Sequence, residues 1–241
     1  MKWQDEGIVL SAKRYGERSV IVSILTRDHG RHLGIWKGHA SALMQPGTHV
    51  NVHWQARLPE HLGMWKLESL QEMAAYVLQD PLKLAILISA TRLLDACVPE
   101  RHVYVQLLQQ LKELLQHCRE SESPGDCPPR FMMTYCFFER DLLGEMGFGV
   151  DLSTCAVTGG VENLAYVSPK SGRAVCAHAA APYKARLLPL PRFFHQTVES
   201  SVTWAEIDAA LKMTGYFIGK HLLPGALLEA RERLMAYVVR Q

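Results

Sequence analysis

The chain has 241 residues, of which 48% are hydrophobic, and its 26 Lys and Arg against 24 Asp and Glu give a formal net charge of +2. This length and apolar content suffice for one large or two small folded domains and exclude a disordered protein. A net charge so close to zero neither demands nor excludes nucleic acid. No apolar run approaches the roughly 18 residues of a membrane span, and the acidic start lacks the features of a signal peptide, so we expect a cytoplasmic, nucleoid-associated protein without membrane contact.

Three short runs of alternating apolar residues open the chain. The first begins at Ile8, the second covers residues 19–26, and the third covers residues 31–37 after an Asp28-His29-Gly30 turn. The pattern predicts a small antiparallel meander with a basic rim, formed by Arg14, Arg18, Arg27, Arg31, Lys37 and, just beyond it, His39. A basic rim of this kind suits a polyanion better than a small metabolite. An equally compatible interpretation is that these side chains serve solubility and protect a sheet edge.

Two further strands are predicted, from His49 to Arg57 and from Met64 to Leu70. Five short strands in about 70 residues favour a small barrel, of which the five-stranded OB barrel is the common nucleic-acid-binding type. An SH3-like barrel would give much the same pattern. The period of apolar residues then changes from two to 3.6, so we predict a domain boundary and assign residues 1–78 to the barrel and 79–241 to a helical domain. The fold class is therefore α+β.

The helical domain carries clear start and stop signals. Asp80-Pro81 begins a largely apolar helix, a second helix covers about residues 103–118, and a third runs from Pro128-Pro129 through Met146. Residues 119–129 between them form a polar loop, the place where we most expect disorder. Strand character returns at about 150–180 as a hairpin with arms 164–167 and 173–176. Thr203 and Glu206 form a capping box that begins a fourth helix, and a last helix precedes the C-terminus.

A search for catalytic motifs finds no nucleophile, general base or metal-binding set. The glycines of residues 144–149 follow a helix instead of opening one, which favours a helix C-cap over a phosphate loop. Six cysteines are too few for a disulfide framework in a chain of this length, so we expect reduced thiols. Cys155 and Cys176 flank the hairpin, but Thr158 and Ala179 stand where a zinc ribbon needs its second ligands, which predicts a degenerate site without zinc or any other cofactor.

Three stretches carry a resemblance to a known family. They are EGIVLSAKRYGERSVIVSILTRDHGRHLG with WKG at the start, LLGEMGFGVDLSTCAVTG in the middle and YVSPKSGRAV shortly after it. In these stretches the chain resembles the RecO family of bacterial recombination mediators, and the resemblance spans residues 6–240. It implies an OB barrel, a helical domain with a zinc-ribbon-like segment, binding of single- and double-stranded DNA, and strand annealing in DNA repair. It also implies cooperation with RecR to load RecA onto DNA covered by single-strand binding protein, whose acidic C-terminal tail the helical domain recognises.

Two departures from the family pattern concern the predicted sites. Relatives commonly continue the Lys37-Gly38 step with arginines, whereas His39-Ala40-Ser41-Ala42 follows here, so the DNA-binding surface is weaker or displaced. The two metal-ligand pairs are each reduced to one cysteine. Arginines for the acidic tail do not transfer by motif; Arg130 and Arg140 are the nearest candidates, and a solvated helix face is the alternative for both.

The sequence thus favours a non-enzymatic protein whose basic barrel surface binds phosphates and offers aromatics such as Tyr15 or Trp36 for base stacking. An alternative is a protein-interaction adaptor whose barrel has little DNA affinity, which the missing arginines after Gly38 favour. A metal-dependent enzyme is a third hypothesis, which would require stoichiometric zinc.

Overall fold

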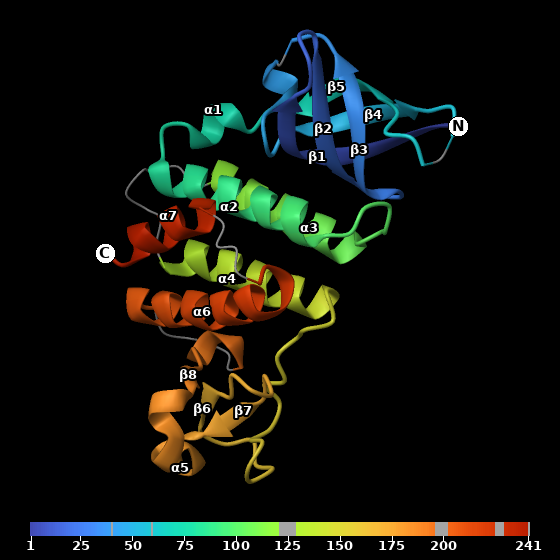
Figure 1. Ribbon diagram of the computed structural model, residues 1–241. Coiled ribbons are helices and arrows are strands. Elements are labelled where there is room, and N and C mark those ends of the chain that lie inside the picture. Colours follow the sequence, from blue (N-terminus) through green and yellow to red (C-terminus); the bar gives the residue numbers. More distant parts are fainter. Residues whose placement is uncertain (40, 59, 121–128, 196–201, 225–228, 241) are drawn as a thin grey trace. The chain divides into compact units, whose positions relative to one another are not determined.

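A computed structural model describes the chain except for residues 40, 59, 121–128, 196–201, 225–228 and 241 (Figure 1). It forms two compact units, Met1–Pro124 and Gly125–Gln241. The predicted disorder of residues 119–129 falls mostly outside the described residues. No helix of the described part is both long enough and apolar enough to cross a bilayer.

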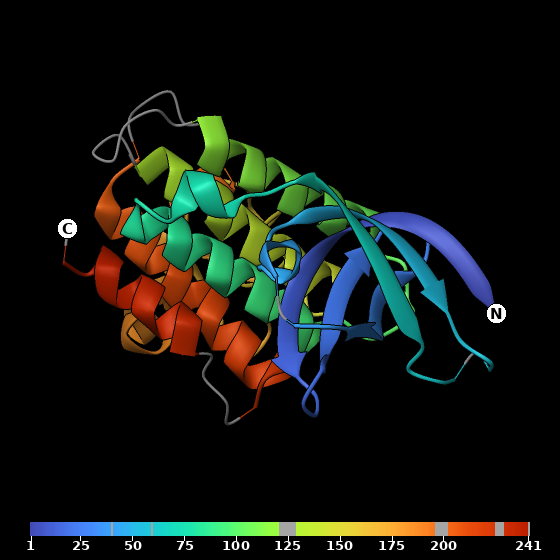
Figure 2. The same cartoon turned by 90° about the horizontal axis from the view of Figure 1, so that it is seen from above.

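The first unit contains the five-stranded barrel that the alternating pattern predicts. Its strands close in the order β1-β2-β3-β5-β4 and are β1 (Lys2–Arg14), β2 (Ser19–Thr26), β3 (Gly30–Lys37), β4 (His49–Gln55) and β5 (Met64–Gln71). All pairings are antiparallel except that of β3 with β5, which joins Ile35 to Met64. A closed five-stranded barrel with this mixed closure is of the OB type, which confirms the predicted fold. Figure 2 shows the curled strands from above.

The barrel closes because β1 is long and pairs on both sides. Its first half, from Lys2, pairs with β4, and its second half, to Arg14, pairs with β2. Alternation sends side chains of β2 such as Val22 and Ile24 into a core that also holds Trp54 and Trp65. Gly34 lies against the second indole, where an added Cβ would stand 2.6 Å from Trp65 Nε1, so only glycine fits that position.

Three helices complete the first unit: α1 (Ala74–Val77), α2 (Pro81–Cys97) and α3 (Val105–Glu120). The predicted N-cap is confirmed, because Asp80 Oδ1 accepts hydrogen bonds from the backbone amides of Leu82 and Lys83 at 2.9 and 3.1 Å. Helix α2 packs on β1, and α1 packs on α2 and α3. The compact units therefore divide at residues 124 and 125, whereas the domains of residues 1–78 and 79–241 stay a prediction from the change of period.

The second unit combines helices with a small sheet. Its helices are α4 (Pro129–Glu145), α5 (Ala177–Ala180), α6 (Trp204–Phe217) and α7 (Glu229–Val238), and its strands are β6 (Leu164–Val167), β7 (Ala174–Cys176) and β8 (Leu188–Pro189). The predicted hairpin is present as β6 and β7, and β8 adds a third strand beside β6. The capping box of Thr203 and Glu206 is also confirmed. Helix α6 contacts α4, α7 and β8, so it organises this unit.

A buried ion pair lies among the helices of the second unit. Arg231 of α7 donates to Glu139 of α4 through Nε at 2.7 Å and Nη2 at 2.9 Å, and Tyr135 adds a 2.8 Å bond to the same carboxylate. Arg231 is 5% exposed and Glu139 is fully buried. Burial alone would lower the pKa of Arg231, but the adjacent Glu139 carboxylate holds that pKa above its usual value. Arg231 therefore keeps its positive charge inside the folded unit.

Candidate nucleic-acid interface

The predicted basic residues divide between the two ends of β2. Arg14 pairs with Val20 at the start of β2, and Lys37 pairs with Ser19 beside it. The turn between β1 and β2 is tied to the end of β3 by a 3.0 Å hydrogen bond from the Gly38 amide to the Arg18 carbonyl. Arg27 and Arg31 lie at the other end of β2, about seven residues or roughly 23 Å away. The six predicted residues therefore do not form one surface.

We call Arg14, Arg18 and Lys37 the barrel-end cluster. All three side chains are exposed, and His39, which follows Lys37 by two residues, is exposed as well. Within the described residues none of the three takes part in an ion pair, although Glu17 lies in the same turn. Tyr15, of which 54% is exposed, is available for stacking, whereas Trp36 packs against the barrel core. The barrel-end cluster thus presents three cations to solvent, and the neighbouring Tyr15 presents a phenol ring.

Arg31 has a structural role instead. Its Nε donates to the Val98 carbonyl at 2.7 Å, and its two terminal nitrogens lie 3.5 Å from carboxylate oxygens of Asp95 and Glu100. Only 13% of the side chain is exposed. A largely buried guanidinium whose charge is offset by two carboxylates has little attraction left for a phosphate. We therefore remove Arg31 from the candidate site.

Arg27 is exposed but also paired. Its guanidinium donates to Asp28 and lies 3.6 Å from Glu6. The hydrogen bond to Asp28 raises the pKa of Arg27, and the attraction of the neighbouring carboxylates adds to it. Because these acidic groups offset its charge, Arg27 contributes little attraction for a polyanion.

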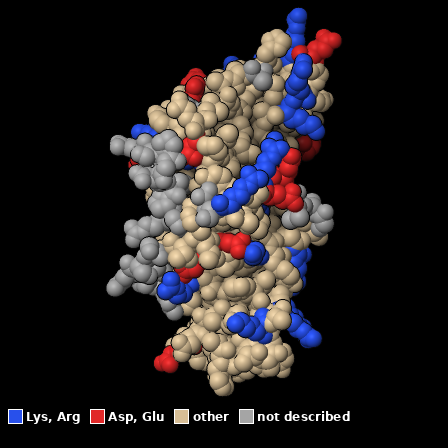
Figure 3. Space-filling model, turned by 90° about the vertical axis from the view of Figure 1, so that its left-hand side faces the viewer, with Lys and Arg blue, Asp and Glu red and all other residues tan. Residues whose placement is uncertain are grey.

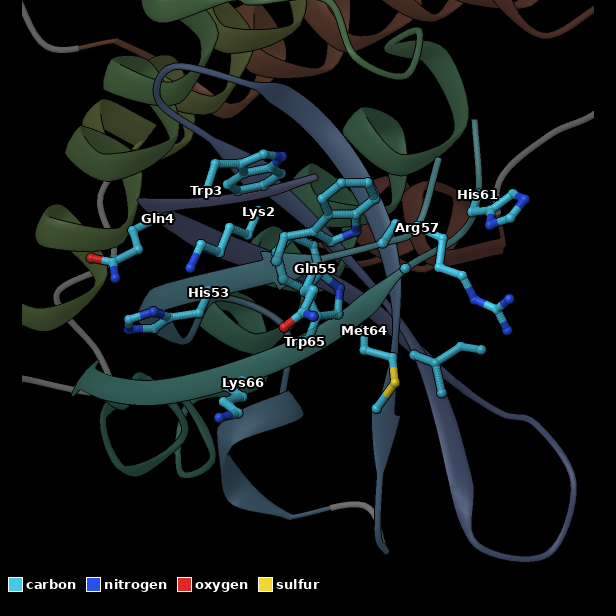
Figure 4. A pocket seen from close by; sticks show the side chains of 14 residues that line it. Lys2, Trp3, Gln4, His53, Gln55, Arg57, His61, Met64, Trp65 and Lys66 are labelled. Carbon is cyan, nitrogen blue, oxygen red and sulfur yellow. The ribbon is translucent and has the colours of Figure 1, made fainter. Parts of the chain in front are cut away.

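A second basic surface was missed by the sequence analysis. A pocket of about 750 Å³ lies against β1, β4 and β5, and we call it the strand pocket. Figure 4 shows Lys2 and Gln55 near its centre, Gln4, His53 and Lys66 on one side, and Arg57 and His61 on the other. No Asp or Glu is among its lining residues.

Register explains why these side chains share one face. Lys2 pairs with Gln55, which pairs with Met64, and Gln4 pairs with His53, which pairs with Lys66. The intervening row, Trp3, Trp54 and Trp65, alternates with these polar residues along the strands; it also lines the pocket, and Trp54 and Trp65 are buried. Since the paired residues Lys2 and Gln55, and likewise Gln4 and His53, are more than 45 positions apart in the chain, only the barrel brings these polar residues together.

Charge is distributed unevenly over the surface. On the face shown in Figure 3, Lys and Arg side chains lie in small separate groups, several of them beside Asp or Glu. Paired groups of this kind have little long-range field. The barrel-end cluster and the strand pocket differ from them because their cations have no carboxylate partner within the described part of the chain.

The predicted site for an acidic tail concerns α4. Arg140 donates to Asp141 at 2.7 Å, and its guanidinium carbon lies 4.7 Å from the Phe137 ring and 5.5 Å from that of Phe194. These rings and Phe193 form an aromatic cluster beside an arginine. The side chain of Arg130 lies outside the described residues. The assignment of Arg140 to a partner's tail stays a prediction.

The degenerate metal site holds two thiols. The Cys176 amide donates to Cys155 Sγ at 3.3 Å, and Thr158 Oγ1 lies 3.9 Å from Cys176 Sγ. Burial would raise the pKa of Cys155, but bonds from Thr158 and from backbone amides outweigh it and bring that pKa to about 6. A structural zinc needs four ligands, and the described residues bring no third Cys, His, Asp or Glu to this place. The residues present do not fit zinc.

The fold and these surfaces define a class: an OB-type barrel with unpaired cations at its connections, joined to a helical unit. Comparison with known proteins agrees with this class. Residues 1–71 match the family model "Recombination protein O N terminal", and residues 78–228 match "Recombination protein O C terminal". The chain belongs to the RecO family.

Similar proteins cover nearly the full chain. The "DNA repair protein RecO" of Brucella abortus (strain 2308) is 41% identical over 92% of this chain and 88% of its own length. That of Chelativorans sp. (strain BNC1) is 42% identical over 100% of this chain and 96% of its own. That of Bartonella quintana (strain Toulouse) is 41% identical over 92% and 90%. The predicted family is therefore confirmed.

Proposed function

We propose that this protein is a non-enzymatic, DNA-binding recombination mediator in DNA repair. Its membership of the RecO family supports a role in repair and recombination. The observation that carries DNA binding is the barrel-end cluster, in which Arg14, Arg18 and Lys37 are exposed on an OB barrel without ion pairs among the described residues. OB barrels bind oligonucleotides through strands 2 and 3 and through the β1–β2 and β4–β5 connections. The barrel-end cluster lies at the β1–β2 connection.

The mechanism is electrostatic and stoichiometric. Cations that contact phosphates release counterions, so binding is independent of sequence and weakens steeply with salt. A protein that neutralises phosphates on two complementary strands reduces their mutual repulsion. Annealing then proceeds without nucleotide hydrolysis, and the protein binds the strands without changing any covalent bond.

The partners follow from the family resemblance. We propose that the protein cooperates with RecR to load RecA onto DNA covered by single-strand binding protein. The acidic, aromatic-ended tail of that protein would meet Arg140 and the adjacent rings of Phe137 and Phe194, because a guanidinium beside aromatic side chains suits a carboxylate next to a ring. We further propose that no zinc is required, and that the protein acts in the cytoplasm, where a bacterial chromosome lies.

The test is fluorescence anisotropy with labelled single-stranded and duplex oligonucleotides. Replacing Arg14, Arg18 and Lys37 by alanine should weaken binding to both, and the slope of log K against log salt should fall by about three if each cation contacts one phosphate. Lys170, Lys184 and Arg186, all exposed in the second unit, give a control variant with the same change in charge. Equal behaviour of the two variants would contradict the assignment of DNA to this cluster.

A protein-interaction adaptor is the second candidate. The observation that favours it is the loss of Arg27 and Arg31 to ion pairs, which leaves a small cationic surface. An adaptor would capture a peptide with the tail sequence of single-strand binding protein while the unmodified protein showed no salt-dependent DNA binding. The same anisotropy titration therefore separates the two functions.

A further inference from the structure

We propose that the strand pocket binds unpaired nucleotides and gives the protein a preference for single-stranded over duplex DNA. This inference rests on the proposed DNA-binding function and adds a second contact with its own specificity. The pocket adjoins the β4–β5 connection through Arg57 and His61. That connection is the other nucleic-acid-binding loop of OB barrels, so the pocket and the barrel-end cluster occupy both of the usual positions.

The size and chemistry of the pocket fit a nucleotide. Its volume of about 750 Å³ lies in the range of small-molecule sites. Gln4 and Gln55 offer amide donors and acceptors for base edges, and His53 and His61 offer imidazole nitrogens. Ile35 and Met64 supply apolar surface for the face of a base. A pocket that only neutralised phosphates would not need this mixture of groups.

The three cations are available to a sugar-phosphate backbone. Lys2, Arg57 and Lys66 are exposed, and none of them has an ion pair within the described ranges. The nearest acidic side chain along β5 is Glu68, which pairs with Asn51 one row further from the pocket. Glu60 lies in the β4–β5 connection but does not line the pocket. The local charge is therefore positive although the whole chain is almost neutral.

The pocket favours single-stranded over duplex DNA because a duplex buries the edges and faces of its bases. In duplex DNA the Watson–Crick edges are paired and the base faces are stacked, so amides in a concave site reach neither. In a single strand the bases unstack at low cost and can enter a pocket. The barrel-end cluster, by contrast, offers mainly charge, which both forms of DNA attract. The two surfaces should therefore respond differently to the form of the DNA.

A neutral variant tests this distinction. Gln4→Leu/Gln55→Leu removes the amide groups from the pocket without a change in charge, and both side chains are exposed on the strand surface. We expect its affinity for a dT15 strand to fall about fivefold or more, while its affinity for a 15-base-pair duplex and its salt slope stay within about twofold of wild type. Circular dichroism checks that the barrel is folded.

A charged variant provides the second measurement. Arg57→Glu/Lys66→Glu should weaken dT15 binding more than tenfold, whereas Lys170→Glu/Lys184→Glu, with the same charge change, should weaken it by less than about threefold. Tryptophan fluorescence, to which the pocket residues Trp3, Trp54 and Trp65 contribute, should change on dT15 binding in a Trp204→Phe background and not in the pocket variants.

The outcomes separate the two proposals. If wild-type protein binds neither strand nor duplex, the proposed function fails. If wild type binds DNA but both pocket variants match the control, the pocket assignment is overturned and the proposed function stands. If the neutral variant weakens strand and duplex equally, the preference for unpaired nucleotides is refuted.

Discussion

His32 should make the barrel sensitive to acid. Its ring lies in the core, 5% exposed, with edge-on contacts to Trp3, Trp54 and Trp65 at centroid distances of 5.1, 4.7 and 6.1 Å. Neither ring nitrogen has a hydrogen-bond partner in the part of the chain that the structure describes. Burial, with smaller contributions from the charges of Arg101 and His29, lowers the pKa of His32 from 6.5 to about 4.

The sign and size of the effect follow from proton linkage. Between pH 6.5 and 4 the unfolded chain binds a proton at His32 that the folded barrel does not, so the stability is fully present above pH 6.5 and is lost as the pH falls toward 4. Each pH unit in this interval is worth about 1.4 kcal/mol. From about pH 7.5 to about pH 4.5 the histidine alone should therefore remove about 2.5 kcal/mol of unfolding free energy.

The assay compares wild type with His32→Phe in urea unfolding across this pH range. Phenylalanine keeps an aromatic ring in the core and cannot be protonated, so the variant should gain about 2.5 kcal/mol over wild type between the two pH values. His32→Leu should show the same relative gain even if its packing is poorer. His39→Gln, which changes an exposed histidine of the same unit, should follow wild type. Parallel pH profiles for wild type and His32→Phe would refute the reasoning.

Three further results are expected. Glu139→Gln should cost about 3–5 kcal/mol because it leaves the Arg231 charge buried without its partner, whereas Glu139→Leu/Arg231→Met should lie closer to wild type; calorimetric unfolding measures both. Arg31→Ala should lower the unfolding free energy by about 2 kcal/mol through loss of its bonds to Val98, Asp95 and Glu100, yet leave DNA affinity within about twofold. A loss of DNA affinity well beyond twofold in the folded variant would return Arg31 to the candidate site. Elemental analysis of purified protein should find zinc well below one equivalent, and stoichiometric zinc would show that ligands beyond Cys155 and Cys176 complete a site.

Local sequence signals predicted most of the barrel but not the first half of β1. Residues 49–55 alternate cleanly between apolar and polar, residues 19–26 and 64–70 each keep an apolar row, and all three segments are strands. Lys2–Glu6 was missed because its inward positions are Trp3 and Asp5 instead of two apolar residues. The Asp5 side chain is fully buried, and it accepts hydrogen bonds from the Asp28 amide and shares one with His29. A buried carboxylate held by a turn 23 residues away leaves no local apolar pattern.

The site was harder to predict than the fold because its ion pairs and its strand pairings join residues that are far apart in the sequence. Alternation correctly placed the basic residues at strand ends, but the acidic partners of Arg31 come from the end of α2 and the loop after it. The strand pocket has a similar origin, since Lys2, Gln55 and Met64 become neighbours only through the β1–β4 and β4–β5 registers. A weak signal was present in the polar residues His53, Gln55 and Arg57, which mark a single exposed strand face.

The length of β1 joins the two proposed DNA-contacting surfaces through a single strand. Lys2 and Gln4 at its start belong to the strand pocket, and Arg14 at its end belongs to the barrel-end cluster. Fraying of this strand from either end would disturb both the strand pocket and the barrel-end cluster. Nucleic acid bound at one end should therefore slow amide hydrogen exchange along the entire strand. We therefore expect binding at one proposed surface to stabilise the other through the thirteen residues of this strand.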